Sequence, residues 1–433
     1  MIKKLFTTRL GQNVLTNYLA MAWLGVLSLA LIPVYVNRLG PGQWGVVAIC
    51  ITVQGFLGLL DAGLGQIMQR DIARVEGDRA RETKTFRVFS RLYLGLGIAG
   101  FLIGQMAAGW FAHFWVQAEG INTAEIESAS RLVLIQFLFQ FSNNAHIGYW
   151  NGLQHQKTAN IRQCGFQTAK HAAAVALVLF WRPDAFAYLI PFAAISAIEW
   201  SVNRYSIRAG LAVAGDQVKT TGADLYAVAR RGAVLGTGVL IGMLVSQMDR
   251  IILSRTVALA DYGTYVIVAN LGLAFLQLQY PLVRALFPRI MQDETATPKR
   301  DSSKTMMLGM LVLCVIPCVV LAGFAPAILQ LWIGNPGVVE QGAMPLRLIM
   351  LAVAMNAVYQ VVYLRILALN VHRFVLFLNA FILLPYVLVV PRLAIEFGIV
   401  AGGIGWIFYT FAQLLAGLFF LKWYASSQKD IAP

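Results

Sequence analysis

The sequence has little charge for its length. Only 12% of the 433 residues are Asp, Glu, Lys or Arg, whereas 58% are hydrophobic and the mean hydropathy is +0.67. Soluble globular chains carry about 25% charged and roughly 45–50% apolar residues. Long polar stretches are also scarce, because apolar runs of about 20 residues recur along almost the whole chain, and each can cross a bilayer as a helix. The composition excludes a soluble protein, leaves no room for a sizeable soluble domain and predicts an all-α integral membrane protein.

Cysteine and histidine are scarce as well. The four cysteines, Cys50, Cys164, Cys314 and Cys318, all lie in apolar runs, and a disulfide would need a close partner in an oxidising compartment. Cys314 and Cys318 share a helical face, where a small apolar contact is the simpler interpretation. The five histidines are scattered along the chain, so the sequence predicts neither a metal site nor a cofactor.

Acidic residues are outnumbered by basic ones, 20 against 34, which gives a net charge of +14. The basic residues are concentrated in alternate short loops, which is the pattern of cytoplasmic loops in membrane proteins. The surplus therefore indicates topology, and no nucleic-acid partner is predicted. Both termini are expected in the cytoplasm. The first apolar run is too long for a signal peptide and lacks an A-x-A site, so it is expected to remain as a span.

Twelve transmembrane spans are predicted. A polar break at about 205–230 divides them into two six-helix bundles, so we expect an N-terminal bundle over residues 1–205, a cytoplasmic linker over 206–230 and a C-terminal bundle over 231–433. The predicted spans are 12–36, 44–66, 91–116, 131–153, 163–181, 185–204, 231–254, 262–286, 305–332, 345–369, 374–392 and 398–421.

The two halves resemble each other weakly. The segment 43–64 aligns without gaps on 261–282, with Trp44-Gly45 on Tyr262-Gly263 and Leu60 on Leu278. Chance can produce so few identities in apolar sequence, but the matched place in each half favours duplication. Because both halves begin on the cytoplasmic side, the expected repeat is parallel, about an axis along the membrane normal. In this alignment Asp61 pairs with Gln279, and Gln66 with Arg284.

Ionisable residues inside the predicted spans are the main candidates for function. Each charge at mid-depth costs about 2.5–3.5 kcal/mol and needs water, a partner or a ligand. Lys170 and Glu199 lie on adjacent spans, and they form either an ion pair that locks two helices or part of a cavity. Asp249 and Arg250 are neighbours about 100° apart on a helix, so we expect them to serve different surfaces.

Basic residues outnumber acidic ones in the spans, which favours an anionic cargo and, for arginine, a phosphate. The alternative for Arg38, Arg284 and Arg365 is that they extend to the lipid headgroups. Uncharged polar residues also gather in the first two spans of each half, either as interhelical hydrogen bonds or as a wetted surface where the halves meet. The candidate substrate-binding residues are Arg38, Arg250, Arg284, Lys170, Arg365, Gln54, Asn270 and Gln277, and the candidate coupling carboxylates are Asp61, Asp249 and Glu199.

Several short motifs resemble a known family. Pro33, Arg38-Leu39-Gly40, Trp44-Gly45, Asp61-x-Gly63-Leu64 and Arg70 are similar in order and spacing to the N-terminal pattern of the Wzx-type O-antigen flippases. These are polysaccharide transporters of the multidrug/oligosaccharidyl-lipid/polysaccharide exporter superfamily. Asp249-Arg250 followed by Tyr262-Gly263 resembles the family's pattern at the start of its second half. The length and the twelve spans match along the whole chain.

The resemblance implies a V-shaped pair of bundles with a cationic central cavity in the cell inner membrane. The implied cargo is an undecaprenyl-diphosphate-linked oligosaccharide, moved from the cytoplasmic to the periplasmic leaflet by alternating access. Proton or other ion coupling and association with other polysaccharide assembly proteins remain open. A multidrug antiporter of the same superfamily is the alternative, although its usual cationic cargo fits a net-positive interior poorly. A membrane enzyme of the pathway is disfavoured, because no predicted outer loop exceeds about fifteen residues.

Overall fold

The computed structural model describes residues 9–61, 63–211, 220–293, 302–369 and 371–429, and they are almost entirely helical. They form two compact units, Met1–Leu244 and Val245–Pro433, each of which is a bundle of helices. The boundary between the units lies inside one long helix, α8 (Gly222–Thr256). The prediction that 206–230 is a separate linker remains a prediction, although α7 extends to Leu211 and α8 begins at Gly222.

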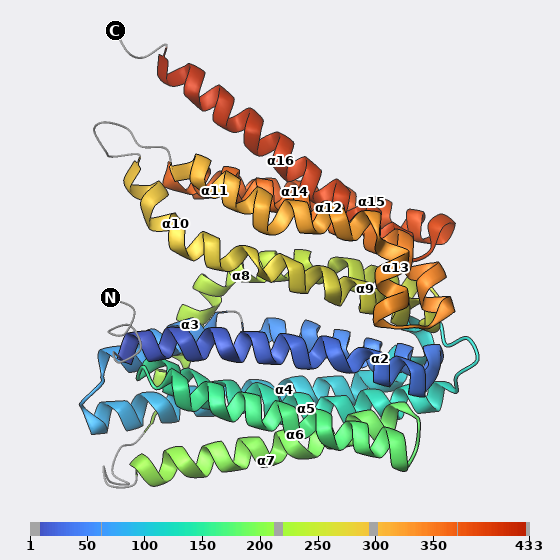
Figure 1. Cartoon of the computed structure of the whole chain (residues 1–433). Coiled ribbons are helices and arrows are strands. Elements are labelled where there is room, and N and C mark those ends of the chain that lie inside the picture. Colours follow the sequence, from blue (N-terminus) through green and yellow to red (C-terminus); the bar gives the residue numbers. More distant parts are fainter. Residues whose placement is uncertain (1–8, 62, 212–219, 294–301, 370, 430–433) are drawn as a thin grey trace. The chain divides into compact units, whose positions relative to one another are not determined.

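In the first unit, helices α4, α5, α6 and α7 run side by side (Figure 1), with α5 in contact with α2, α4 and α7. The core is formed by apolar side chains of α3, α4 and α5, among them Met68, Phe89 and Phe141. The helices of this unit are α2 (Arg9–Leu57), α3 (Leu64–Arg74), α4 (Arg79–Trp110) with a π-helical turn at Phe111–Trp115, α5 (Thr123–Gly152), α6 (Gln156–Phe180), α7 (Ala185–Leu211) and the beginning of α8.

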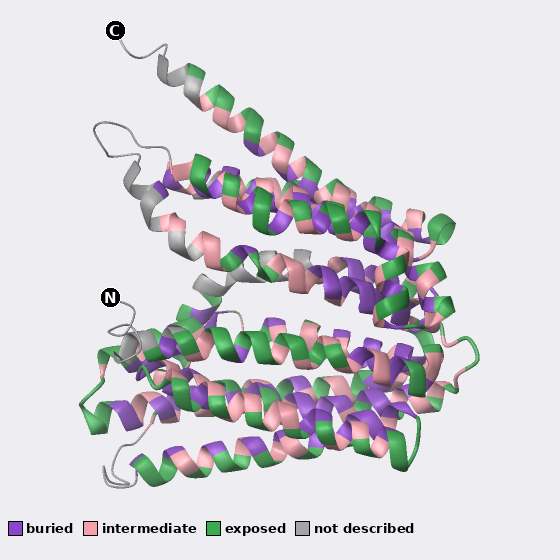
Figure 2. Ribbon diagram, in the orientation of Figure 1, coloured by how far each residue is buried: buried purple, intermediate pink, exposed green. Residues whose placement is uncertain are grey.

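In the second unit, α14 is the central helix, in contact with α9, α12, α13 and α16. Figure 2 shows α9 buried over most of its length, as the nearly unbroken run of buried residues from Tyr262 to Ala269 indicates. The remaining helices are α9 (Leu259–Gln277), α10 (Gln279–Asp293), α11 (Ser302–Met310) with a π-helical turn at Leu311–Val315, α12 (Ile316–Gly323), α13 (Ala325–Trp332), α14 (Pro336–Ala368), α15 (His372–Phe397) and α16 (Val400–Lys429).

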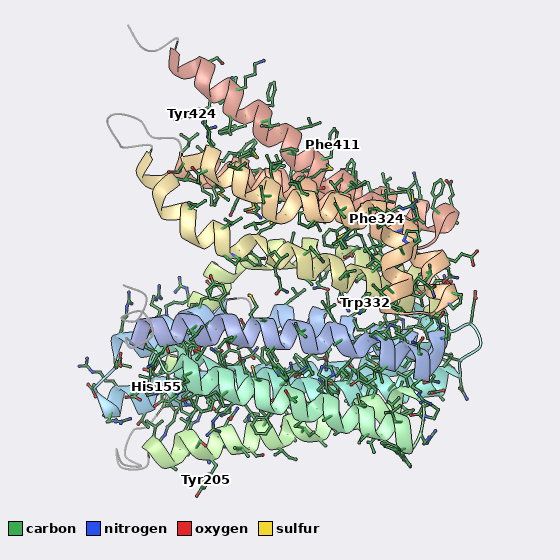
Figure 3. The ribbon with its side chains drawn as sticks, viewed as in Figure 1. His155, Tyr205, Phe324, Trp332, Phe411 and Tyr424 are labelled. Carbon is green, nitrogen blue, oxygen red and sulfur yellow. The ribbon has the colours of Figure 1, made fainter. Side chains whose placement is uncertain are left out.

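Among the described residues, eight helical stretches are long and apolar enough to cross a bilayer. They are Leu15–Asp61, Arg79–Trp115, Ala185–Leu211, Leu259–Val283, Ser302–Gly323, Pro336–Ala368, Phe377–Phe397 and Val400–Tyr424. The first contains two predicted spans, because Gly40 inside α2 has a non-helical backbone with φ 75°. Exposed aromatic side chains such as Tyr205, Phe324 and Phe411 (Figure 3) are compatible with a lipid-facing surface. The chain is therefore an all-helical, multi-pass membrane protein.

Three predicted spans have different bounds in the structure. The span predicted at 44–66 leaves the α-helix at Leu57, forms a 3₁₀ turn over Gly58–Asp61 and resumes at Leu64. The span predicted at 262–286 is interrupted at Leu278, and the span predicted at 305–332 ends at Gly323. Hydropathy does not detect such breaks, since the apolar run continues through each of them.

The breaks at Gly58–Asp61 and Leu278 fall at corresponding positions. The ungapped alignment places Leu278 on Leu60, so both copies of the segment interrupt a helix at the same register. In the first copy the break contains Asp61 and the left-handed Gly63, φ 78°, and in the second it contains Gln279 followed by Pro281. A shared irregularity is harder to explain by apolar composition than a few shared residues, and it supports the expected repeat.

Candidate functional site

Lys170 and Glu199 form a buried ion pair in the first unit. Lys170 Nζ donates to Glu199 Oε2 at 2.8 Å, and the two side chains are only 3% and 8% exposed. Lys170 is on α6 and Glu199 on α7, so the contact fastens these helices together. Of the two interpretations left open by the sequence, the structure places both residues in the ion pair.

A hydrogen-bonded network extends from this ion pair. Asn143 Nδ2 donates to Glu199 Oε1 at 2.9 Å, and Asn203 Nδ2 donates to Asn143 Oδ1 at 2.9 Å. Arg162 continues the chain through Asn203 Oδ1 at 3.0 Å and Ser206 Oγ at 2.9 Å. Sequence reasoning missed Asn143 and Asn203, although polar residues inside the predicted spans 131–153 and 185–204 were a usable signal. The network joins α5, α6 and α7 and gives the pair a structural role.

Asp61 lies half-buried at the break between α2 and α3. The Tyr93 hydroxyl of α4 donates to Asp61 Oδ1, and the Gly65 backbone amide also hydrogen-bonds the carboxylate. The turn is possible because Gly63 adopts a left-handed conformation that a residue with a side chain rarely takes. The break therefore leaves the carboxylate half-buried and hydrogen-bonded to neutral donors.

Among the described carboxylates of the second unit, Asp249 is the most buried, with only 2% of its surface exposed. Tyr265 Oη of α9 donates to Asp249 Oδ2 at 2.5 Å, and Trp406 Nε1 of α16 donates to the same oxygen at 3.0 Å. Gly402 makes this approach possible, because a Cβ there would lie 2.4–2.6 Å from the ring and hydroxyl atoms of Tyr265. Among the described residues no cation pairs with Asp249, so only neutral donors stabilise the carboxylate.

Arg250 is also buried, at 6% exposed. One of its terminal guanidinium nitrogens donates to Asn270 Oδ1 at 2.8 Å, and no carboxylate pairs with it among the residues that the structure describes. Asp249 and Arg250 thus contact different groups, as the helical geometry predicts. A permanently charged guanidinium with only a neutral amide as partner is able to bind an anion.

For the other predicted site residues, the structure gives the burial but few contacts. Arg38, Gln277 and Arg365 are exposed, which leaves the headgroup interpretation of the two arginines open. Gln54 is half-buried, and its amide nitrogen has no hydrogen-bond partner among the described residues. The side chain of Arg284 lies outside the described residues. Within the described part of the chain, no group of three or more His, Cys, Asp or Glu side chains is placed to hold a metal ion.

The chain is similar along most of its length to a named protein and to solved structures. The chain is 20% identical over 374 residues to a Shigella flexneri protein named "Putative O-antigen transporter", which covers 85% of this chain and 87% of that protein. Among solved structures, it is similar to the lipid II flippase MurJ in an inward closed conformation, with a TM-score of 0.69, 9% identity and coverage of 95% of this chain and 87% of that one.

A second solved structure resembles the fold of this chain to a comparable degree. An inward-facing multidrug resistance MATE family transporter of the MOP superfamily matches with a TM-score of 0.64, 15% identity and coverage of 94% of this chain and 96% of that one. The TM-scores show a shared fold, and the low sequence identities do not extend the likeness to a shared cargo. The model of the polysaccharide biosynthesis protein family matches residues 10–294, which is more than half of the sequence. The chain therefore belongs to the polysaccharide biosynthesis protein family.

Proposed function

We propose that this protein is a flippase that moves an undecaprenyl-diphosphate-linked oligosaccharide from the cytoplasmic to the periplasmic leaflet of the cell inner membrane by alternating access. The twelve-span topology with both termini in the cytoplasm and the parallel repeat of two six-helix bundles are part of the same proposal. Support comes from the family match and from the distant relative whose name includes O-antigen transport.

The observation that carries the proposal is the environment of Arg250. A buried guanidinium keeps its charge at every physiological pH and needs compensation in a medium of low dielectric. Its described partner is the neutral Asn270 oxygen at 2.8 Å. The diphosphate of the cargo would supply two adjacent anionic groups, which the planar fork of arginine binds in a bidentate manner. We assign Arg250 to the diphosphate, with Arg284 as a second candidate.

Asp249 is the best-placed coupling residue of the three predicted carboxylates. Glu199 is already neutralised by Lys170, and Asp61 is only half-buried. Asp249 is buried, and its donors among the described residues are neutral, so loading and release of a proton would change the charge of the second unit by one beside Arg250. A proton on Asp249 leaves Arg250 as the uncompensated charge and favours binding of the anionic cargo, whereas its release opposes binding.

A deletion strain tests the proposed function. Loss of the gene is expected to abolish the surface polymer while lipid-linked repeat units accumulate on the cytoplasmic side. Protection of cells from cationic dyes, with the surface polysaccharide unchanged by the deletion, would contradict the proposal and favour the multidrug antiporter.

A further inference from the structure

Two arginines of the first unit share one carboxylate at the cytoplasmic end predicted for this unit. Arg231 on α8 contacts Asp71 Oδ2 through a terminal nitrogen at 3.0 Å, and Arg70 on α3 contacts Asp71 Oδ1 through Nε at 3.6 Å. The arginine side chains are 46% and 47% exposed, whereas Asp71 is only 13% exposed. We infer that Arg70 and Arg231 form a loading site for the diphosphate headgroup of an isoprenyl lipid, held in place by Asp71.

The scaffold fixes the positions of these side chains. Helix α3 buries Leu64, Ile67, Met68 and Ile72 in the core of the first unit and exposes the opposite face, which carries Arg70. The beginning of α8 packs Val228 into the same core, and Gly232 lies against Leu64, where a Cβ would come within 2.6 Å of a methyl group. Packing therefore brings Arg231 next to α3, and its position does not depend on the salt bridge alone.

A second ion pair anchors α8 independently. Lys84 Nζ of α4 lies 2.9 Å from Asp224 Oδ1 in the first turn of α8. Thr221 and Asp224 form a capping box, in which the Thr221 amide donates to Asp224 Oδ2 at 2.9 Å and the Asp224 amide donates to Thr221 Oγ1 at 3.3 Å. Hydrogen bonding from the Thr221 amide, aided by Lys84, lowers the pKa of Asp224 to about 2, so the anchor is charged at physiological pH.

The charges around Asp71 favour a dianionic or trianionic ligand. Two guanidinium groups carry two positive charges and Asp71 carries one negative charge, so the cluster keeps one uncompensated positive charge. Each arginine uses one nitrogen in its contact with Asp71. The two side chains are about half-exposed, so the remaining guanidinium nitrogens can donate hydrogen bonds to phosphate oxygens.

The inferred site rests on the proposed function, because it supplies cargo to the transporter. Arg231 and Arg250 belong to the same helix, α8, so the helix carries one arginine for loading and another for holding the diphosphate. The loading site takes the headgroup from the cytoplasmic leaflet while the isoprenyl chain remains in the lipid. A bilayer phospholipid such as phosphatidylglycerol offers only one phosphate, which matches the two guanidinium groups less well.

Binding of undecaprenyl diphosphate to the full-length protein tests the site. The measurement uses phosphatidylcholine nanodiscs and an Arg250→Gln background, so that the loading site is observed separately from the holding site. Adding Arg70→Gln and Arg231→Gln is expected to weaken the remaining binding by about tenfold or more, since charge-assisted hydrogen bonds to both arginines are lost. Lys84→Gln is the matched control: it breaks the other ion pair of α8, leaves the arginines in place and is expected to bind as the background does.

Three further results decide the interpretation. The double variant Arg70→Lys, Arg231→Lys keeps both positive charges but removes the planar guanidinium groups. Unchanged binding of undecaprenyl diphosphate by this variant would overturn the bidentate site. Asp71→Asn adds net positive charge while removing the common anchor, so weaker binding supports the site and tighter binding contradicts it. Equal competition by phosphatidylglycerol would also overturn it.

If Arg250→Gln alone leaves binding and transport unchanged, the proposed holding site fails, whereas unchanged binding in the Arg70/Arg231 glutamine variant rejects only the loading site.

Discussion

Buried charges are neutralised in different ways in the two units. Glu199 has a lysine partner and a surrounding amide network, so both charges of the ion pair are satisfied. Asp249 receives two hydrogen bonds from uncharged groups, and Arg250 donates to an amide oxygen. The first arrangement stabilises one conformation, and removing one partner leaves an unpaired charge. The second leaves charges that a proton or an anion can compensate.

The structural role of Lys170 predicts a large loss of stability. Lys170→Ala leaves Glu199 buried without its cation, and we expect unfolding in detergent to become easier by about 3–5 kcal/mol. Lys157→Ala, at an exposed position on the same helix, is the control and is expected to change stability little. Equal thermal stability of the two variants would show that the pair does not hold α6 and α7 together.

Asp249 is predicted to set the ion dependence of transport. Asp249→Asn keeps the shape and the hydrogen bonds but cannot change charge, so transport should no longer respond to a proton gradient in proteoliposomes. Asp261→Asn, in the first turn of α9, serves as the comparison and should retain the response. Normal gradient dependence in the Asp249→Asn protein would assign coupling elsewhere, with Asp61 as the next candidate.

At the residue scale, charges were easier to predict than their partners. Lys170, Glu199, Asp249 and Arg250 stand out because an ionisable residue in an apolar run is costly. Tyr265 and Trp406 did not stand out, since an aromatic side chain in a span is usually a packing residue. Their role follows from the meeting of α9 and α16, helices separated by more than a hundred residues of sequence.

At the scale of elements, the helices were predictable and their interruptions were not. The apolar runs located most helices, because backbone groups in lipid must be satisfied within the segment. The same rule conceals the break at Leu278, because the stretch Leu259–Val283 stays apolar on average across it. Pro281 in the span was a signal for a bend, and the positive φ of Gly40 became visible only in the structure.

The contact between α9 and α16 makes a prediction about Gly402. A methyl group at this position would lie 2.4–2.6 Å from the ring and hydroxyl atoms of Tyr265. Gly402→Ala must therefore displace Tyr265 from Asp249, at a cost of about 1–3 kcal/mol in stability, and it should lower transport. Gly95→Ala on α4 is the control, since nothing lies within 4 Å of its added carbon. Identical melting temperatures and transport for the two variants would contradict the proposed support of Asp249.

At the scale of the whole molecule, the sequence predicted a helical membrane protein and its family, because both depend on a pattern of apolar runs that many different sequences share. A series of apolar helices survives changes at most positions, which explains how a TM-score of 0.69 accompanies 9% identity. The cargo does not follow from such a pattern, since it depends on a few side chains. The division of the chain inside α8, at 244/245, also depended on packing that hydropathy does not report.

The predicted orientation is testable by cysteine labelling. In a variant in which Cys50, Cys164, Cys314 and Cys318 are replaced, Glu119→Cys is expected to react with an impermeant maleimide in intact spheroplasts. Lys157→Cys is expected to react only after the membrane is permeabilised, because it lies in the first turn of α6, at the end of the helix predicted to be cytoplasmic. Reaction of Lys157→Cys in intact spheroplasts would reverse the topology.

The central claim is that Arg250 holds the diphosphate of a lipid-linked oligosaccharide during translocation, and the most direct measurement is transport in proteoliposomes. A fluorescent undecaprenyl-diphosphate oligosaccharide is incorporated, and its appearance in the opposite leaflet is followed by an impermeant quencher. The wild-type protein is expected to move the lipid, and Arg250→Gln to slow the initial rate by about ten- to a hundredfold, corresponding to about 1.5–3 kcal/mol for a charge-assisted hydrogen bond. Transport by Arg250→Gln at the wild-type rate would contradict the claim.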